Sequence, residues 1–220
     1  GGEKIVIYPF RELFNADLPE NIFLNIIYED NDILIINKNA GLVVHPGAGN
    51  MNGTILNALL YRYKNIHNLP RSGIVHRLDK NTSGLMVIAK NMYSYIFLLN
   101  LLKKRKIVRE YQAIVKGNMI SGGIIDNPIS RHKTKKICMM TSSIGRKAIT
   151  HYKIIKRFKG YTHVLLRLDT GRTHQIRVHM LHIGYPLLGD PLYCPSNYIH
   201  VSKLYDKKSA IFIQNFSRQA

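Results

Sequence analysis

The segment His76-Arg77-Leu78-Asp79-Lys80-Asn81-Thr82-Ser83-Gly84-Leu85-Met86-Val87-Ile88-Ala89-Lys90 joins a polar turn to an apolar run. The run from Leu85 to Ala89 is apolar at consecutive positions, which predicts a strand buried on both faces. We therefore expect Asp79 at the edge of a sheet, in a turn that also carries the cations Arg77 and Lys80. The alternative is a surface turn with a local ion pair, worth about 0–1 kcal/mol.

The spacing of apolar residues predicts several further elements. Strands are expected at residues 32–37, 110–116, 148–155 and 161–169, and helices at 53–61, 92–102 and 173–182. The strands outnumber the helices and do not alternate with them as they do in a parallel sheet. This pattern indicates an α+β domain built on a largely antiparallel sheet.

Composition narrows the class of protein. The 220 residues, 45% of them hydrophobic, are enough for one sizeable core. No apolar run reaches the roughly 20 residues that span a bilayer. Cys138 and Cys194 form no CxxC pair, which favours a reducing cytoplasm over a disulfide framework or a zinc ribbon. We expect a cytoplasmic monomer.

The net charge of +19 points to a polyanionic partner, either nucleic acid or an anionic membrane. The chain has no Trp, and no basic amphipathic helix with an aromatic face is expected from its sequence. We therefore predict a nucleic acid and no membrane. The basic cluster at residues 103–106 either contacts RNA or interacts with the dipole of the helix that it ends.

Four separate motifs carry a resemblance to a known family. The Asp79 segment resembles the catalytic motif of the RluA-type pseudouridine synthases, and the similarity runs from about Ile22 to the last residue. The other motifs match in order and spacing, and they lie at residues 41–60, 109–117 and 170–193.

The resemblance implies the pseudouridine synthase fold, a long, mixed, mostly antiparallel bent sheet with flanking helices and a central RNA-binding cleft. It implies a catalytic domain at residues 22–220, which ends where a further strand is expected in the family. Residues 1–21, with a short strand at 4–8, are expected to be the linker that follows a missing S4-type RNA-binding domain.

The reaction breaks the bond from uracil N1 to ribose C1′, turns the base and joins C5 to C1′. The resemblance implies that Asp79 is the nucleophile and that Arg177 is the ion-pair partner that holds it. It implies that Tyr111 packs on the flipped base and removes the C5 proton, and that Arg77 fills the space that the uridine leaves. Taken singly, Tyr111 is an ordinary strand aromatic, Arg177 a helix salt bridge and Arg77 a phosphate contact. Neither a metal nor a cofactor is required, because no redox step or phosphoryl transfer occurs.

Other basic residues are expected to bind the RNA backbone. Arg172 and His174 lie at the start of the last predicted helix, where free backbone N–H groups favour phosphate. Arg131, Lys133, Lys135 and Lys136 lie between two apolar stretches, which predicts a hairpin tip; a solvated basic loop is the alternative. A metal site at His174, His179 and His182 is disfavoured, because no carboxylate or thiol completes the set.

Within the family, residues 45–50 and 127–132 are most similar to members that modify large-subunit (23S) ribosomal RNA, in the ribosome or in pre-ribosomal particles. A synthase of the same family acting on tRNA is one alternative. A non-catalytic RNA-binding or ribosome-assembly module is another, since the basic surface does not by itself require chemistry. A metal-dependent nuclease lacks the paired carboxylates of a two-metal site.

Overall fold

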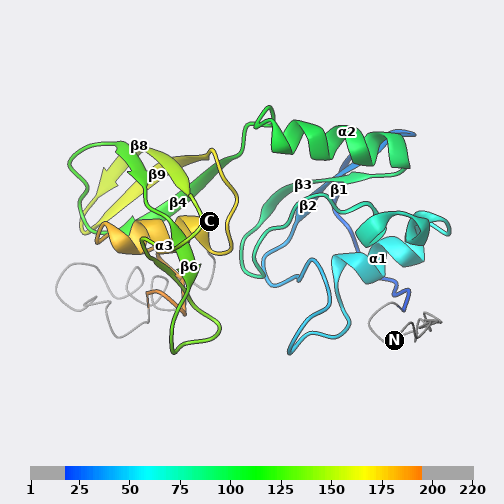
Figure 1. The fold of residues 1–220 in the computed structure, drawn as a ribbon, viewed down its shortest axis with the longest axis horizontal. Helices are drawn as coiled ribbons and strands as arrows, with labels where there is room; N and C mark the ends of the chain where they lie inside the picture. Colours follow the sequence, from blue (N-terminus) through cyan, green and yellow to red (C-terminus); the bar gives the residue numbers. More distant parts are fainter. Residues whose placement is uncertain (1–17, 195–220) are drawn as a thin grey trace, which may run out of the picture.

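The structure is a computed structural model that describes residues 18–194. Figure 1 shows two lobes side by side, with the N-terminal half of these residues in one and the C-terminal half in the other. The predicted strand at residues 4–8 and the predicted terminal segment lie outside the described residues.

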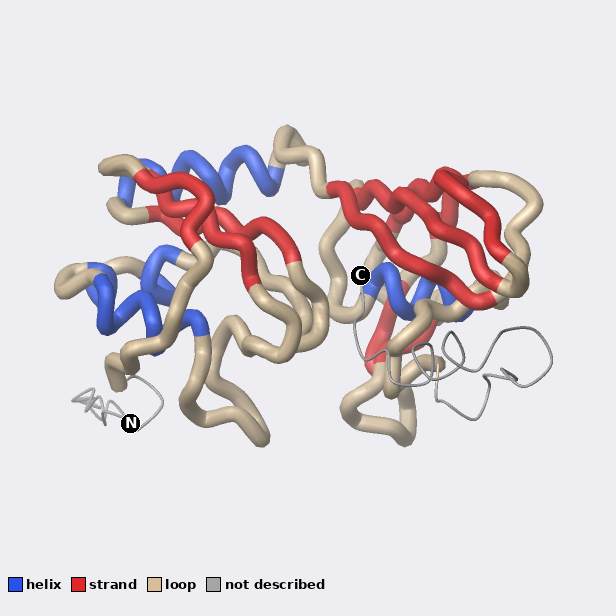
Figure 2. Tube along the Cα trace, turned by 180° about the vertical axis from the view of Figure 1, so that it is seen from behind, coloured by secondary structure: helices blue, strands red, loops and turns tan. Residues whose placement is uncertain are grey.

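The first lobe is an antiparallel sheet with a helix on each face. Its strand order is β1-β2-β3, with α2 against one face and α1 against the other (Figures 1 and 2). The bounds are β1 (Ile26–Glu29), β2 (Ile33–Lys38), α1 (Ile55–Arg62), β3 (Gly84–Ala89) and α2 (Met92–Lys103), with short 3₁₀ turns η2 (Ile66–Asn68) and η3 (Pro70–Gly73).

Both helices of this lobe begin where the sequence predicts, because a side chain caps each one. The Asn57 N–H donates to Thr54 Oγ1 at 3.4 Å, and the Thr54 N–H donates to Asn57 Oδ1 at 3.0 Å. At α2 the Ser94 N–H donates to Asn91 Oδ1 at 2.9 Å. Each contact satisfies a backbone donor that a helix start leaves without an intrahelical partner.

The second lobe is an antiparallel sheet in the order β4-β9-β8-β5, covered by α3. A separate hairpin, β6–β7, extends from it, with the basic residues 131–136 at its tip as predicted. The bounds are β4 (Glu110–Lys116), β5 (Gly123–Asp126), β6 (Ile129–Arg131), β7 (Met139–Thr141), β8 (Ile149–Phe158), β9 (Tyr161–Leu168) and α3 (Gln175–His182).

The α+β class and the antiparallel pairing are confirmed. In place of the expected single long sheet, the hydrogen-bonded ladders of the described residues form three sheets. Two main apolar clusters follow this division. One contains Leu34, Leu59 and Ile88, the other contains Val115 and Leu166, and Tyr111 packs against both.

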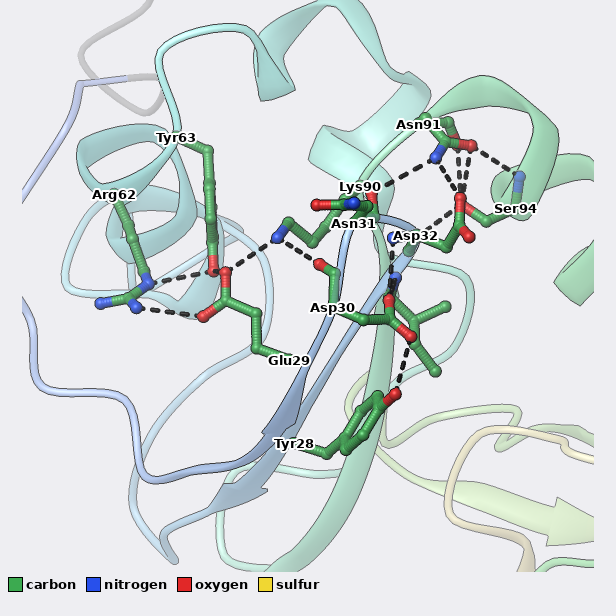
Figure 3. Close-up of polar contacts among 11 residues, drawn as sticks. Tyr28, Glu29, Asp30, Asn31, Asp32, Arg62, Tyr63, Lys90, Asn91 and Ser94 are labelled. Atoms are coloured by element: carbon green, nitrogen blue, oxygen red, sulfur yellow. Dashed lines mark hydrogen bonds and ion pairs between the residues drawn. The ribbon is translucent and has the colours of Figure 1, made fainter.

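A polar network fastens α1 to the sheet of the first lobe (Figure 3). Glu29 accepts hydrogen bonds from Tyr63 Oη at 2.6 Å, Lys90 Nζ at 2.9 Å and Arg62 Nη2 at 3.1 Å. The bond from Tyr63, followed by that from Lys90, lowers the pKa of Glu29 to about 2. The carboxylate therefore joins the end of β1 to the end of α1 and to the residue after β3.

Helix α2 has two exposed aromatic side chains but is not a basic helix, because Lys103 is its one charged residue. Tyr93 and Phe97 are exposed on it, with parallel rings whose centroids are 6.4 Å apart, and Lys103 lies in its last turn. Among residues 18–194, no helix has the length and apolar character needed to cross a membrane.

Candidate functional site

Asp79 and Arg177 meet between the two lobes, although 98 positions separate them along the chain. Asp79 lies in the turn before β3, and Arg177 lies on α3. Arg177 Nη1 donates to Asp79 Oδ2 at 3.0 Å. The Asp79 side chain is 21% exposed, and the contacts of Arg177 and His174 are both made to its Oδ2. One carboxylate oxygen is thus held while the other is left for a ligand.

Arg177 is itself fixed by a second carboxylate. Its Nε and Nη2 donate to the two oxygens of Asp190 at 2.7 and 2.9 Å. Asp190 is fully buried, and its Oδ1 also accepts the backbone N–H groups of Leu192 and Tyr193. A two-point contact of this kind sets the plane of the guanidinium, so Asp190 determines where Arg177 holds Asp79.

His174 and Tyr193 complete the surroundings of this pair. His174 was expected in the first turn of the helix, but it lies just before α3, at the N-cap position, with a left-handed φ of 55° and no capping hydrogen bond from its side chain. Its Nδ1 is 2.8 Å from Tyr193 Oη, and its Nε2 is 3.9 Å from Asp79 Oδ2. Burial lowers the pKa of His174, which leaves it neutral near pH 7. The Tyr193 ring centre lies 4.8 Å from the Arg177 guanidinium carbon.

Two cavities meet at Asp79. The loop cavity, of about 470 Å³, is lined by residues 43–48, by Asn50 and by Ile137 of the β6–β7 hairpin. The tyrosine cavity, of about 360 Å³, contains Tyr111 and His76. Both cavities are lined by the same five residues, namely Arg77, Leu78, Asp79, His174 and Arg177.

The tyrosine cavity is strongly cationic. Asp79 is the single carboxylate in its lining, against five arginines, which are Arg71, Arg77, Arg109, Arg172 and Arg177. A cavity with this balance favours an anionic or oxygen-rich ligand.

Two titratable side chains of this cavity, Tyr111 and His76, are neutral near pH 7. Burial raises the pKa of Tyr111; the charge of Arg109 opposes the rise, and that of Asp79 adds to it. Burial lowers the pKa of His76 to about 4. The Val87 N–H donates to His76 Nε2 at 3.1 Å, so neutral His76 carries its proton on Nδ1.

A buried lysine that the sequence analysis did not select holds the Asp79 turn in place. Lys38 is 1% exposed, and its Nζ donates to the carbonyl oxygens of Asn39, Leu42 and Lys80 at 2.8 to 2.9 Å. Burial lowers the pKa of Lys38 to about 8. Side chains of β2 are buried at every second position, and Lys38 follows the buried positions 34 and 36. This alternation is the signal that could have identified Lys38 as buried.

The remaining predicted residues fall into two groups. Arg77 is exposed at the rim of both cavities, and Arg172 lies in the tyrosine cavity with its Nε bound to the Lys147 carbonyl at 3.0 Å. The hairpin side chains are exposed and line neither cavity; they are Arg131, Lys133, Lys135 and Lys136. Arg131 Nη1 donates to the Lys136 carbonyl at 2.9 Å, which closes the hairpin tip.

The predicted set missed Asp190 and Tyr193, although both lie in one of the quoted motifs. No pattern in the neighbouring residues identifies Asp190 as the partner of Arg177, which lies 13 residues earlier in the chain. In the part of the chain that the structure describes, no three His, Cys, Asp or Glu side chains gather to hold a metal ion. His179, one of the three histidines weighed as ligands, is buried between Thr150 Oγ1 and the Asn127 carbonyl.

Comparisons with known proteins agree with this geometry. The family profile for RNA pseudouridylate synthase matches residues 32–182. Ribosomal large subunit pseudouridine synthase D of Buchnera aphidicola subsp. Schizaphis graminum is 72% identical over 193 residues, or 88% of this chain and 61% of that protein. The protein of the same name from Buchnera aphidicola subsp. Acyrthosiphon pisum is 61% identical over 220 residues, or 100% of this chain and 70% of that protein.

More distant relatives extend the match. The protein of that name from Escherichia coli is 54% identical over 193 residues, or 88% of this chain and 59% of that protein. The chain thus spans about three fifths of the length of two of these relatives. The solved structure of human RNA Pseudouridylate Synthase Domain Containing 1 is 26% identical, with a TM-score of 0.64 over 84% of this chain and 73% of that one.

Human RNA Pseudouridylate Synthase Domain Containing 4 is 29% identical, with a TM-score of 0.58 over 77% of this chain and 68% of its own. The match to the relative from Buchnera aphidicola subsp. Acyrthosiphon pisum spans the whole chain, and so both lobes and the residues that meet between them. The chain belongs to the RNA pseudouridylate synthase family.

Proposed function

We propose that this chain isomerises uridines of large-subunit ribosomal RNA to pseudouridine, with Asp79 as the nucleophile. The observation that carries the proposal is the Asp79–Arg177 ion pair in the wall shared by two cavities. The names of relatives that are 54% to 72% identical support ribosomal RNA as the substrate.

The geometry suits the chemistry. A flipped uridine in the tyrosine cavity would lie beside the free oxygen of Asp79, which attacks ribose C1′ while the N1–C1′ bond breaks and its electrons leave on the uracil. After the base turns, C5 bonds to C1′ and displaces the carboxylate, the C5 proton goes to a base, and N1 takes up a proton. This route uses neither a metal nor a cofactor.

Tyr111 is the candidate for the group that removes the C5 proton. The charge of Asp79 contributes to the raised pKa of Tyr111. Bonding of Asp79 to C1′ removes that charge and lowers the pKa of Tyr111, so more of Tyr111 is deprotonated and able to accept the C5 proton at that stage. Arg77, at the rim of both cavities, is placed to fill the gap that the uridine leaves, while Arg172, His174 and the hairpin bind the RNA backbone.

Replacing Asp79 tests the proposal. Asp79→Asn keeps the size of the side chain and removes the nucleophile, so pseudouridine formation in transcribed large-subunit ribosomal RNA should disappear while RNA binding stays within about threefold. Asp126→Asn, an exposed position on β5, should behave as the wild type. Pseudouridine formation by Asp79→Asn at the wild-type rate would end the claim.

Two alternatives have distinct outcomes. A non-catalytic RNA-binding or ribosome-assembly module would bind RNA and leave it unmodified at every position. A tRNA-modifying synthase would leave ribosomal RNA unchanged, so pseudouridine is mapped in both RNA classes from cells with and without the gene. Full activity in the presence of a chelator would remove a metal-dependent nuclease.

The same proposal covers the location of the chain, its oligomeric state and its domain boundary. The chain would act as a cytoplasmic monomer on ribosomal RNA or pre-ribosomal particles, with its catalytic domain beginning at residue 22. Two residues that precede this boundary contact α1. Asn57 Nδ2 donates to the Leu18 carbonyl, and the Glu20 N–H donates to the Asn57 carbonyl.

A further inference from the structure

Arg109 lies in the wall of the tyrosine cavity, two residues before Tyr111 on the same extended segment. Its carbonyl accepts the N–H of Leu168 at 3.0 Å, so the pairing of β4 with β9 extends to it. Residues two apart on an extended strand share a face. Arg109 and Tyr111 therefore point to the same side, and both line the cavity that contains Asp79.

The guanidinium of Arg109 lacks the protein partners that hold two other arginines of this cavity. Its Nε is buried and has no hydrogen-bond partner among the described residues. Arg177 is bound by Asp190, and Arg172 by the Lys147 carbonyl. A buried donor left unpaired is unfavourable by about 1–3 kcal/mol, and nothing in this part of the chain offsets that cost for Arg109.

Gly171 leaves the space that this guanidinium occupies. A Cβ at Gly171 would lie 2.6 Å from Arg109 Nη1, so the arginine runs against bare backbone there. Gly171 also lines the tyrosine cavity, which puts Nη1 at the cavity wall. Its φ is not in the left-handed region, so an alanine here would not strain the backbone; its Cβ would push against the end of a flexible side chain, the Arg109 guanidinium.

The charge of Arg109 acts on the groups around it in the cavity. After burial, it is the second cause of the lowered pKa of His76, and it opposes the burial that raises the pKa of Tyr111. Its charge thus acts on two side chains that line the same cavity, His76 and Tyr111.

We propose that Arg109 is a further substrate-binding residue, whose guanidinium donates hydrogen bonds to acceptor oxygens of the target nucleotide in the tyrosine cavity. This inference rests on the proposed function. A planar guanidinium fits either two phosphate oxygens or a uracil carbonyl oxygen. Because no described residue holds the group, no protein contact opposes its movement toward the nucleotide.

The experiment compares Arg109→Ala and Gly171→Ala with Lys159→Ala, an exposed cation that lines neither cavity. The readouts are the rate of pseudouridine formation in transcribed large-subunit ribosomal RNA and the melting temperature of each variant. Arg109→Ala should lower kcat/KM by about 10- to 100-fold, as expected when a charged hydrogen bond is removed. Its melting temperature should stay the same or rise, because an unpaired buried donor is removed. Lys159→Ala should change neither.

A double variant tests whether Gly171 acts through Arg109. The Gly171→Ala methyl would displace Nη1, so this variant alone should also lower kcat/KM. In the Arg109→Ala background the same methyl should have almost no further effect, since the side chain that it disturbs is gone. Equal effects of Gly171→Ala in both backgrounds would overturn the link between the two residues.

The salt dependence of RNA binding distinguishes the two kinds of acceptor. If Arg109 binds phosphate, Arg109→Ala should reduce the log–log salt slope by about 0.7. If it binds a uracil carbonyl, the slope should stay unchanged while kcat/KM falls.

Two results would overturn the inference, namely wild-type kcat/KM for Arg109→Ala, or a loss of rate that follows a loss of thermal stability and recovers on cooling. If Arg109→Ala does not fold, Gly171→Ala tests the same contact with every native side chain of the cavity retained, and a wild-type rate for it overturns the inference. A wild-type chain that forms no pseudouridine would instead overturn the proposed function. The two failures are therefore distinguishable.

Discussion

At the scale of single residues, the site depends on Arg177, which forms three hydrogen bonds to two carboxylates. Burial lowers the pKa of Arg177, but the bonds and charge of Asp190, together with the charge of Asp79, raise it above its ordinary value. The guanidinium therefore stays charged in a buried place. Two of its donors bind Asp190, and the third, Nη1, binds Oδ2 of Asp79 and leaves Oδ1 for a ligand.

Arg177→Lys should lower kcat on ribosomal RNA by about 100-fold, because an ammonium cannot hold both carboxylates in the fixed geometry of the guanidinium. The affinity for RNA should change little, since Arg177 is 8% exposed and faces Asp79 and not the surface. Steady-state rates at saturating RNA, with binding measured in parallel, check this. An unchanged kcat would show that the ion pair is not needed to orient Asp79.

Arg77→Ala should also lower turnover at saturating RNA, because Arg77 acts on the flipped state of the uridine and not only on docking. Its exposed side chain makes no hydrogen bond to any described residue, so thermal stability should change by less than about 0.5 kcal/mol. Pre-steady-state rates with enzyme in excess separate the two effects. A variant that loses affinity alone would make Arg77 a phosphate contact.

At the scale of elements, the β6–β7 hairpin and the loop of residues 43–50 lie on either side of the loop cavity. Ile137 is the hairpin residue that lines it, while the lysines of the tip are exposed. Arg131 closes the tip through the Lys136 carbonyl, so the lysines alone are the better probe of RNA contact.

Neutralising Lys133, Lys135 and Lys136 together should flatten the log–log salt dependence of RNA binding by about 2, at roughly 0.7 for each phosphate that the variant no longer neutralises. Turnover on saturating RNA should change little, because these side chains line neither cavity. A matched variant neutralises Lys153, Lys156 and Lys159, which are exposed on β8 and the following turn and line neither cavity. Equal salt slopes for the two triple variants would show that the hairpin tip is a solvated loop and not an RNA contact.

At the scale of the whole molecule, each lobe has its own apolar cluster, and the lobes meet at Tyr111 and at the Asp79–Arg177 pair. The polar network around Glu29 stabilises the first lobe far from the site (Figure 3). The stability of the lobe that carries Asp79 can therefore be varied without touching the reacting groups.

Glu29 makes this stability depend on pH. Its pKa is lowered from 4.5 to about 2 in the folded chain, so the folded state binds fewer protons than the unfolded state in this range. The contribution of Glu29 is therefore complete above about pH 4.5 and is lost as the pH falls to about 2. Denaturant unfolding of Glu29→Gln should show a deficit near pH 7 that closes over this window.

Tyr63→Phe serves as the second variant, because it removes the 2.6 Å hydrogen bond that lowers the pKa of Glu29 most. In this variant, the pH range over which Glu29 loses its stabilising contribution should become narrower. A deficit for Glu29→Gln that stays constant between pH 7 and pH 2 would show that the carboxylate charge contributes nothing.

The sequence by itself determined the features that depend on neighbours along the chain. The helices that begin near Thr54 and Asn91, the strand at residues 110–116 and the hairpin tip at 131–136 follow from periodicity and local polar residues. The short strands β1 and β5 were missed, because four residues are too few for a clear period. The motifs also marked Asp79, Tyr111 and Arg177, and the structure brings these three to one cavity.

Only the tertiary structure decided which groups face one another. The contact of Arg177 with Asp79 spans 98 positions, and no local pattern shows that Asp190 fixes Arg177 or that Lys38 holds the Asp79 turn. Nor does a pattern show that the buried Nε of Arg109 has no partner among the described residues, since that depends on what the rest of the fold places beside it. Propensity and periodicity act over a few residues, whereas these contacts arise when two lobes pack and bury charges that must then find partners.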